Sequence, residues 1–115
     1  MQATIEPNPE GLPQLLAVLA EMVGILEAEG WRLAGAFQQR SGRLQTIIDL
    51  WELDDYNHYA RGLQALSRHA RFPAIAQVLA ANIRSETLVF LDKAPYMRQA
   101  AGSAPEGRKP EELNP

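Results

Sequence analysis

GWRLAGAFQQRSGRLQTIIDLWEL, residues 30–53, determines the architecture predicted for this chain. It reads as two apolar strands joined by a two-residue turn at Ser41-Gly42. Such a turn predicts facing pairs on the two strands: Phe37 with Thr46, Gly35 with Ile48, Leu33 with Leu50, and Arg32 with Trp51. The segment is therefore expected to form a β-hairpin at the centre of a sheet.

Both faces of this hairpin are apolar, which a single small domain cannot cover. One face, expected to pack beneath helices, carries Leu33, Gly35, Phe37, Thr46, Ile48 and Leu50. The other face carries Arg32, Ala34, Ala36, Gln38, Ile47, Asp49, Trp51 and Leu53. Because the second face is too apolar for open water, we expect it to pack against a partner sheet or to line a cavity.

The rest of the chain supplies strands and helices in a regular order. Apolar periodicity and turn residues predict a strand at Ala3–Glu6, helices at Leu12–Glu29, Tyr56–Arg71 and Pro73–Asn82, and a strand at Ile83–Leu91. This β-α-β-β-α-β order predicts an α+β, ferredoxin-like fold with an antiparallel sheet, and two such sheets can combine into a dimeric α/β barrel. We expect this domain to span residues 1–97. Residues 98–115, rich in Pro, Gly and Glu, are expected to form a flexible C-terminal tail.

Composition excludes several functional classes. The 115 residues carry a net charge of −3, whereas nucleic-acid binding requires clustered positive charge. The absence of cysteine excludes disulfides, thiolate nucleophiles and cysteine-based metal sites. No signal peptide and no run of about 20 apolar residues is recognised, so neither secretion nor membrane insertion is expected. A cytoplasmic location is the default expectation.

Four segments carry a family resemblance. They are TIEPNPEGLPQLL near the start, GWRLAGAFQQRSGRLQTIIDLWELDD in the hairpin, YARGLQAL in the next helix and FPAIAQVLAANI before the last strand. Over about residues 3–96 the chain resembles the NIPSNAP family of dimeric α/β-barrel proteins, and Leu50–Asp55 is its best local marker. The resemblance implies a ferredoxin-like fold, a homodimer and a binding or accessory role, and it supplies no catalytic residues.

Two histidines are candidate acids or bases. His58 and His69 lie eleven residues apart on one predicted helix, which separates them by roughly 16 Å and prevents them from sharing a metal ion. Either histidine can act alone if it borders a cavity. The alternative is a partly solvated or interface histidine, since no carboxylate stands at helical spacing to orient either ring.

A second group of candidates lies on the hairpin. The predicted pairing places Arg32 opposite Trp51 and diagonal to Asp49, which permits an ion pair and a cation–π contact. This group can bind a polar ligand inside a closed barrel, or it can be a structural network at a dimer interface. Tyr59 is an aromatic side chain that can belong either to the wall of a ligand site or to the core. The candidate pocket comprises Arg32, Asp49, Trp51, His58, Tyr59 and His69.

No motif indicates a cofactor or a metal. The sequence lacks a phosphate-binding glycine loop, a dinucleotide fingerprint, a serine elbow and a cluster of metal ligands. We expect a dimeric accessory module that binds a small apolar or aromatic molecule or a protein partner. The alternative is a cofactor-independent oxygenase or isomerase, which requires a cavity of roughly 300 Å³ or more containing His58, His69 or Asp49. A third possibility is a subunit whose tail folds onto a larger enzyme.

Overall fold

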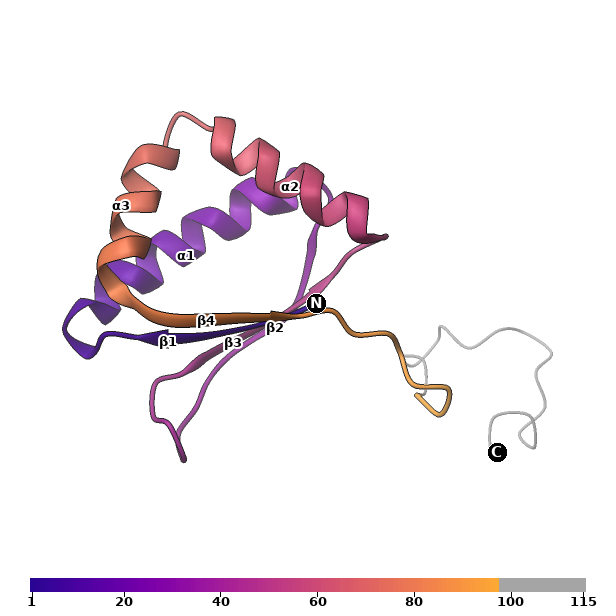
Figure 1. The fold of residues 1–115 in the computed structure, drawn as a ribbon, viewed down its shortest axis with the longest axis horizontal. Helices are drawn as coiled ribbons and strands as arrows, with labels where there is room; N and C mark the ends of the chain where they lie inside the picture. The colour runs from indigo at the N-terminus through magenta and orange to yellow at the C-terminus, as the bar shows by residue number, and fades with distance from the viewer. Residues whose placement is uncertain (98–115) are drawn as a thin grey trace.

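The computed structural model describes residues 1–97, and the tail predicted for 98–115 lies outside the described residues. Figure 1 shows an antiparallel sheet with helices on one side. The elements in chain order are β1 (Gln2–Pro7), the 3₁₀ turn η1 (Pro9–Gly11), α1 (Leu12–Glu27), β2 (Arg32–Gln38), β3 (Ile47–Glu52), α2 (Tyr56–Arg68), α3 (Phe72–Asn82) and β4 (Ile83–Val89).

The sheet has four strands in the order β2-β3-β1-β4, and every neighbouring pair is antiparallel. The two central strands, β3 and β1, are separated in sequence by α1 and β2, and β4 returns to pair with β1. In residues 1–97 all of the helices cover the same face of the sheet (Figure 1). The predicted ferredoxin-like α+β fold is confirmed.

The hairpin between β2 and β3 differs from the prediction. Its connection is not a two-residue turn. β2 ends at Gln38, β3 begins at Ile47, and the eight residues 39–46 join them. Gly42 and Gln45 take up positive φ angles of 67° and 68° within this longer loop. The observed pairs are Arg32 with Glu52, Leu33 with Trp51, Gly35 with Leu50, Ala36 with Asp49, Phe37 with Ile48 and Gln38 with Ile47. The predicted register was therefore wrong.

Beyond Arg32 and Leu33, whose faces agree with the prediction, the two faces of the hairpin are reversed. Ile47, Asp49 and Trp51 point beneath the helices and are buried, whereas Phe37 lies on the bare face and is 57% exposed. A register irregularity between Leu33 and Gly35 lets Leu33 pack with the core while Gly35 and Phe37 lie on the bare face. Alternation alone cannot locate such a bulge, since both faces of the strand are apolar.

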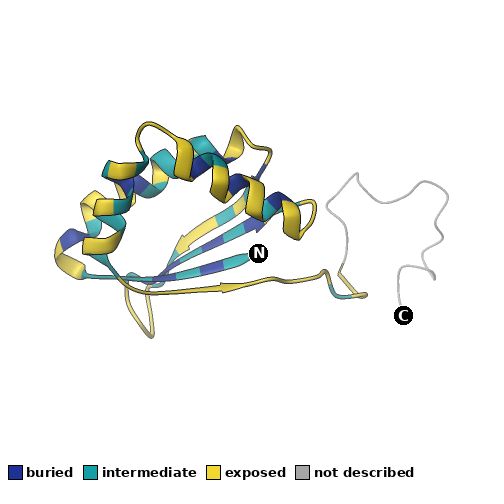
Figure 2. Cartoon of the chain, turned by 45° about the horizontal axis from the view of Figure 1, so that its top comes forward, coloured by how far each residue is buried: buried dark blue, intermediate teal, exposed yellow. Residues whose placement is uncertain are grey.

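The core lies between the sheet and α1. Leu15 is fully buried and packs with Ile5 and Ile47 at one end of the sheet. At the other end, Val18 and Leu26 of α1 pack with Trp31 of the α1–β2 connection, Trp51 of β3, Leu66 of α2 and Ile75 of α3. The buried positions of α1 form one stripe, and its outer side is exposed in Figure 2. This stripe explains why the segment folds as a core helix.

From the sequence, no segment long and apolar enough to cross a membrane was expected, but Pro9–Glu27 is an exception. By length and composition alone this segment passes that test. A core helix meets the same criteria, and here α1 packs against the sheet, α2 and α3. This packing accounts for the buried stripe of α1, whereas only 22% of the apolar window is buried and Leu16 is exposed.

The start of α2 agrees with the prediction and its end does not. Asp55 caps the helix, because its carboxylate accepts a hydrogen bond from the backbone N–H of His58 at 2.8 Å. The helix ends at Arg68, three residues before the predicted end. His69 has an extended backbone there, with φ −68° and ψ 142°, which breaks the helix and allows α3 to begin at Phe72.

The indole of Trp31 joins the end of the α1–β2 connection to α2. Its Nε1 donates a hydrogen bond to the backbone carbonyl of His58 at 3.2 Å. The ring lies directly over Gly62 of α2, where an added Cβ atom would stand 2.2 Å from Nε1. Only a residue without a side chain fits between this helix and the indole.

We predict that Gly62→Ala destabilises the protein by about 1–3 kcal/mol, because the new methyl group forces Trp31 out of its packed position. The matched control is Gly24→Ala in α1, where an added Cβ meets no atom within 4 Å. This control should stabilise the protein by about 0.5–1 kcal/mol through the lower conformational entropy of the unfolded chain. Urea unfolding of both variants measures the difference. Equal effects of the two substitutions would refute the close packing of Trp31 on α2.

Candidate functional site

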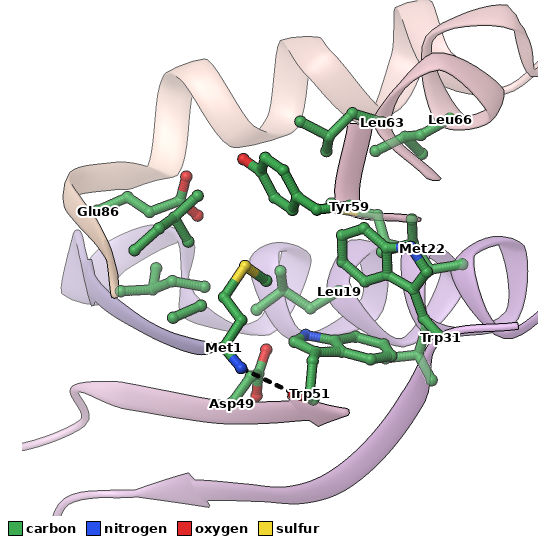
Figure 3. Close-up of a pocket in the computed structure, with 15 residues that line it drawn as sticks. Met1, Leu19, Met22, Trp31, Asp49, Trp51, Tyr59, Leu63, Leu66 and Glu86 are labelled. Carbon is green, nitrogen blue, oxygen red and sulfur yellow. Dashed lines mark hydrogen bonds between the residues drawn. The ribbon is translucent and has the colours of Figure 1, made fainter. Parts of the chain in front are cut away.

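A cavity of about 220 Å³ lies between the sheet and helices α1 and α2 (Figure 3). Each strand except β2 contributes to its floor, and the two helices form its walls. The lining residues are Met1, Ala3, Ile5, Leu19, Met22, Val23, Leu26, Trp31, Asp49, Trp51, Tyr59, Leu63, Leu66, Glu86 and Leu88. The lining is predominantly apolar, which is typical of a site for a small organic molecule.

Aromatic rings form one side of this cavity. The Trp31 ring meets Trp51 edge-on, with centroids 5.3 Å apart, and stacks with Tyr59 at 5.7 Å. Phe90, just beyond β4, meets Tyr59 edge-on at 5.1 Å and approaches Tyr56 at 4.9 Å. The rings therefore form a continuous aromatic series from β3 across α2 to the segment after β4.

Two carboxylates interrupt the apolar lining. Asp49 of β3 pairs with Ala3 of β1, and Glu86 of β4 pairs with Ile5 of the same strand, so the two acids flank β1 on the face beneath the helices. Asp49 is only 8% exposed, whereas Glu86 lies at the exposed rim with its carboxylate turned towards the cavity. The pocket thus has acidic groups at its floor and at its rim.

The surroundings favour the neutral forms of these acids. Burial raises the pKa of Asp49, and the nearby Glu86 carboxylate raises it further. Burial also raises the pKa of Glu86. The pKa of Tyr59 is raised by burial, by Glu86 and by Tyr56. The effect of Glu86 on Tyr59 agrees with Figure 3, where the phenol oxygen points to the same side of the pocket as the Glu86 carboxylate.

Within residues 1–97, neither carboxylate forms a hydrogen bond or ion pair with another protein group. The positively charged amino group of Met1 lines the pocket as well, but it donates its hydrogen bond to the backbone carbonyl of Trp51 at 2.9 Å. In this part of the chain no lysine, arginine or histidine lines the cavity. Within this part of the chain Asp49 is therefore a largely buried acid that forms no ion pair.

The structure brings three of the six candidate residues together. Asp49, Trp51 and Tyr59 line the cavity. Arg32 does not reach it, because the observed register pairs it with Glu52 on the bare face, where the two side chains form a salt bridge. The predicted contact of Arg32 with Trp51 was therefore wrong. His69 lies outside the cavity as well, exposed at the end of α2.

His58 is buried but structural. Its Nδ1 accepts a hydrogen bond from the backbone N–H of Asp54 at 3.0 Å, and its Nε2 lies 2.8 Å from the backbone carbonyl of Glu29. These partners define the tautomer with the proton on Nε2, because one ring nitrogen must accept and the other must donate. With both nitrogens engaged, His58 ties the loop before α2 to the end of α1 and has no atom available for proton transfer.

Glu86 and the α1 wall were absent from the candidates derived from the sequence. A signal for Glu86 exists, because alternation along the last strand places it on the same face as Leu88.

The cavity of about 220 Å³ is smaller than the roughly 300 Å³ that was expected from the sequence for an oxygenase or isomerase. Among residues 1–97, no group of three or more His, Asp or Glu side chains is arranged to hold a metal ion.

Comparison with known proteins gives a consistent picture. The NIPSNAP family model matches residues 4–98. An uncharacterised NIPSNAP domain protein from Burkholderia xenovorans is 24% identical, with a TM-score of 0.71 over 85% of this chain and 96% of the other. A NIPSNAP family protein from Agrobacterium tumefaciens is 20% identical, with a TM-score of 0.66 over 84% of this chain and 88% of the other. Comparison with curated proteins produced no match. At these identities the solved structures establish the fold alone.

We predict that Asp49→Asn raises the thermal unfolding midpoint at pH 7 and has little effect near pH 4. Because the pKa of Asp49 is raised in the folded protein, the folded state binds the proton more tightly than the unfolded state. The contribution of Asp49 to the free energy of unfolding is therefore lost as the pH rises through the pKa of Asp49 in the folded protein. An asparagine at this position does not ionise and avoids that loss. Calorimetric scans between pH 4 and pH 8 measure the effect.

Asp92→Asn, at an exposed position, is the control and should leave the midpoint unchanged across this pH range. A destabilised Asp49→Asn variant at pH 7 would contradict the absence of a protein counter-ion.

Proposed function

The chain belongs to the NIPSNAP family, and from this premise we propose that it is a dimeric binding protein that holds a small apolar or aromatic molecule between its sheet and its helices. The observation that carries this proposal is the cavity of about 220 Å³ lined by two tryptophans, a tyrosine and aliphatic side chains. An apolar cavity of about 150 Å³ is enough to bind benzene. The volume here suits a molecule with one or two rings.

The polar groups of the cavity support binding with a defined orientation. Asp49 and Glu86 lie towards one side, and Leu63 and Leu66 of α2 lie on the wall of the cavity away from the sheet. A ligand can place its polar group against the acids and its apolar body against the leucines and the indoles. This division between one polar end and one apolar end is typical of small-molecule sites.

We further propose that a second copy of the chain covers the bare face of the sheet. Phe37, Ile48 and Leu50 lie on this face, and in residues 1–97 no helix packs against it. The Phe37 ring folds over Gly35, where an added Cβ would stand 2.6 Å from it, so the ring extends along the sheet as a flat apolar surface. Such a surface is self-complementary when two copies meet about a two-fold axis.

The second candidate is a proton-transfer enzyme of the isomerase type, restricted to small substrates because the cavity of about 220 Å³ is below the roughly 300 Å³ expected from the sequence. The observation in its favour is Asp49, because a carboxylate whose pKa is raised by burial is a stronger base than one in water. Asp49 would take a proton from a carbon of the bound molecule and return it to another. Turnover abolished by Asp49→Asn, with binding retained, would distinguish catalysis from binding alone.

We predict that 2-phenylethanol binds the cavity and changes the tryptophan fluorescence in a saturable manner. Both tryptophans of the protein line the cavity, so the whole signal arises there. Leu63→Phe fills the rim and should weaken binding by about tenfold, a loss of about 1.4 kcal/mol.

Leu16→Phe is the matched control, because Leu16 and Leu63 are both 39% exposed but Leu16 does not line the cavity. Absence of saturable binding, or equal weakening by both substitutions, would contradict a ligand site between sheet and helices.

We predict that the protein sediments with about twice the 12.8 kDa mass of one chain, and that Phe37→Lys converts it to monomers. A lysine at this position places a charge in the proposed interface, where it has no partner. Leu44→Lys is the control, since Leu44 is 64% exposed in the hairpin loop and should leave the dimer intact. A monomeric wild-type protein at micromolar concentration would refute the dimer.

A further inference from the structure

We infer that the preferred ligand carries a protonated amine beside its apolar body, with Asp49 as the counter-ion of that amine. This inference rests on the proposed ligand site and adds the chemical class of the molecule that occupies it. Its basis is the charge and hydrogen-bonding state of the groups that line the cavity.

Asp49 is the first part of the argument. More than nine-tenths of this residue is buried, and its side chain lines the cavity without a hydrogen-bond donor from residues 1–97. An ionised carboxylate with most of its surface withdrawn from water is destabilised unless a cation or hydrogen-bond donors compensate it. A ligand ammonium group offers both a positive charge and N–H donors to the Asp49 oxygens.

The other polar and aromatic groups act in the same direction. Glu86 places a second carboxylate on the same face of the sheet, across β1 from Asp49, and when ionised both carboxylates attract a cation. Trp31, Trp51 and Tyr59 present aromatic rings around the same space. Aromatic rings attract ammonium groups, and the attraction increases where water is excluded. Acids and rings together suit an amine better than a neutral or anionic group.

The one positively charged group that lines the cavity in residues 1–97 is the amino group of Met1. It forms no ion pair with Asp49 or Glu86 there and is engaged with the Trp51 carbonyl. An anionic ligand would have to bury its charge against two carboxylates with only this amino group to offset them. The cavity therefore discriminates against anions.

Binding of an amine should depend on pH in a defined direction. The groups facing Asp49 are Glu86 on β4, the Tyr59 phenol on α2 and the Met1 amino group beside β3. Because burial and Glu86 raise the pKa of Asp49, a proton competes with the amine at acidic pH. Affinity for the amine should rise as Asp49 ionises, whereas affinity for a neutral molecule of the same shape should not.

Three probes of matched shape test the inference: 2-phenylethylamine, 2-phenylethanol and 3-phenylpropanoate. Calorimetric titration of the full chain at pH 7 should give an affinity for the amine at least about tenfold above that for the alcohol. The propanoate should bind more weakly than the alcohol. Between pH 7 and pH 5 the affinity for the amine should fall and that for the alcohol should stay constant.

Variants locate the site of discrimination. Asp49→Asn should abolish the preference for the amine while leaving alcohol binding within about twofold, and Glu86→Gln should reduce the preference. Asp92→Asn is the control and should retain the full preference, since this exposed residue does not line the cavity. Asp49→Asn and Glu86→Gln both keep a side chain of the same shape. Circular dichroism checks that both variants are folded.

The outcomes separate the two proposals. If none of the three probes binds, the ligand site itself is refuted. If the alcohol or the propanoate binds as tightly as the amine, the site stands and the amine preference is overturned. A preference for the amine that persists in both Asp49→Asn and Glu86→Gln would also overturn it, because the discriminating charge would then lie elsewhere.

Discussion

The indole of Trp31 is the contact on which the remaining structure depends. Its edge donates to the His58 carbonyl, one face stacks with Tyr59, and Gly62 allows α2 to approach it closely. Trp51 meets the same ring from the sheet. Trp31, Trp51 and Tyr59 all line the cavity, so the contacts of the Trp31 ring also shape the aromatic wall of the cavity.

Much of the architecture follows from local sequence patterns. The order of strands and helices and the Asp55 cap could be predicted, because they depend on apolar periodicity and turn residues that act within a few positions. The hairpin register could not, since a bulge near Ala34 and a long loop set it. The face of β3 was assigned wrongly for a related reason. The prediction directed the face that carries Asp49 away from the helices, whereas the structure buries this acid among apolar residues beneath them.

The candidate site, like the fold, could be predicted only in part from the sequence. Asp49, Trp51 and Tyr59 were named as candidates and line the cavity, but the orientation of Asp49 and Trp51 beneath the helices was not predicted. Arg32 was paired with Trp51 through an incorrect register and instead bonds Glu52 on the opposite face. The role of His58 depends on backbone groups of Glu29 and Asp54, which no side-chain pattern reveals. The aromatic and acidic groups beneath the helices, and the bare apolar sheet behind them, support the proposal of a dimer that binds a small molecule.

Fluorine NMR of protein labelled with 5-fluorotryptophan tests the location of the ligand site most directly, because Trp31 and Trp51 are the two tryptophans of the chain and both line the cavity. Two resonances are expected, and both should shift in a saturable manner when 2-phenylethanol is added. Binding detected by calorimetry with both resonances unchanged would place the ligand elsewhere and would contradict a site between the sheet and the helices.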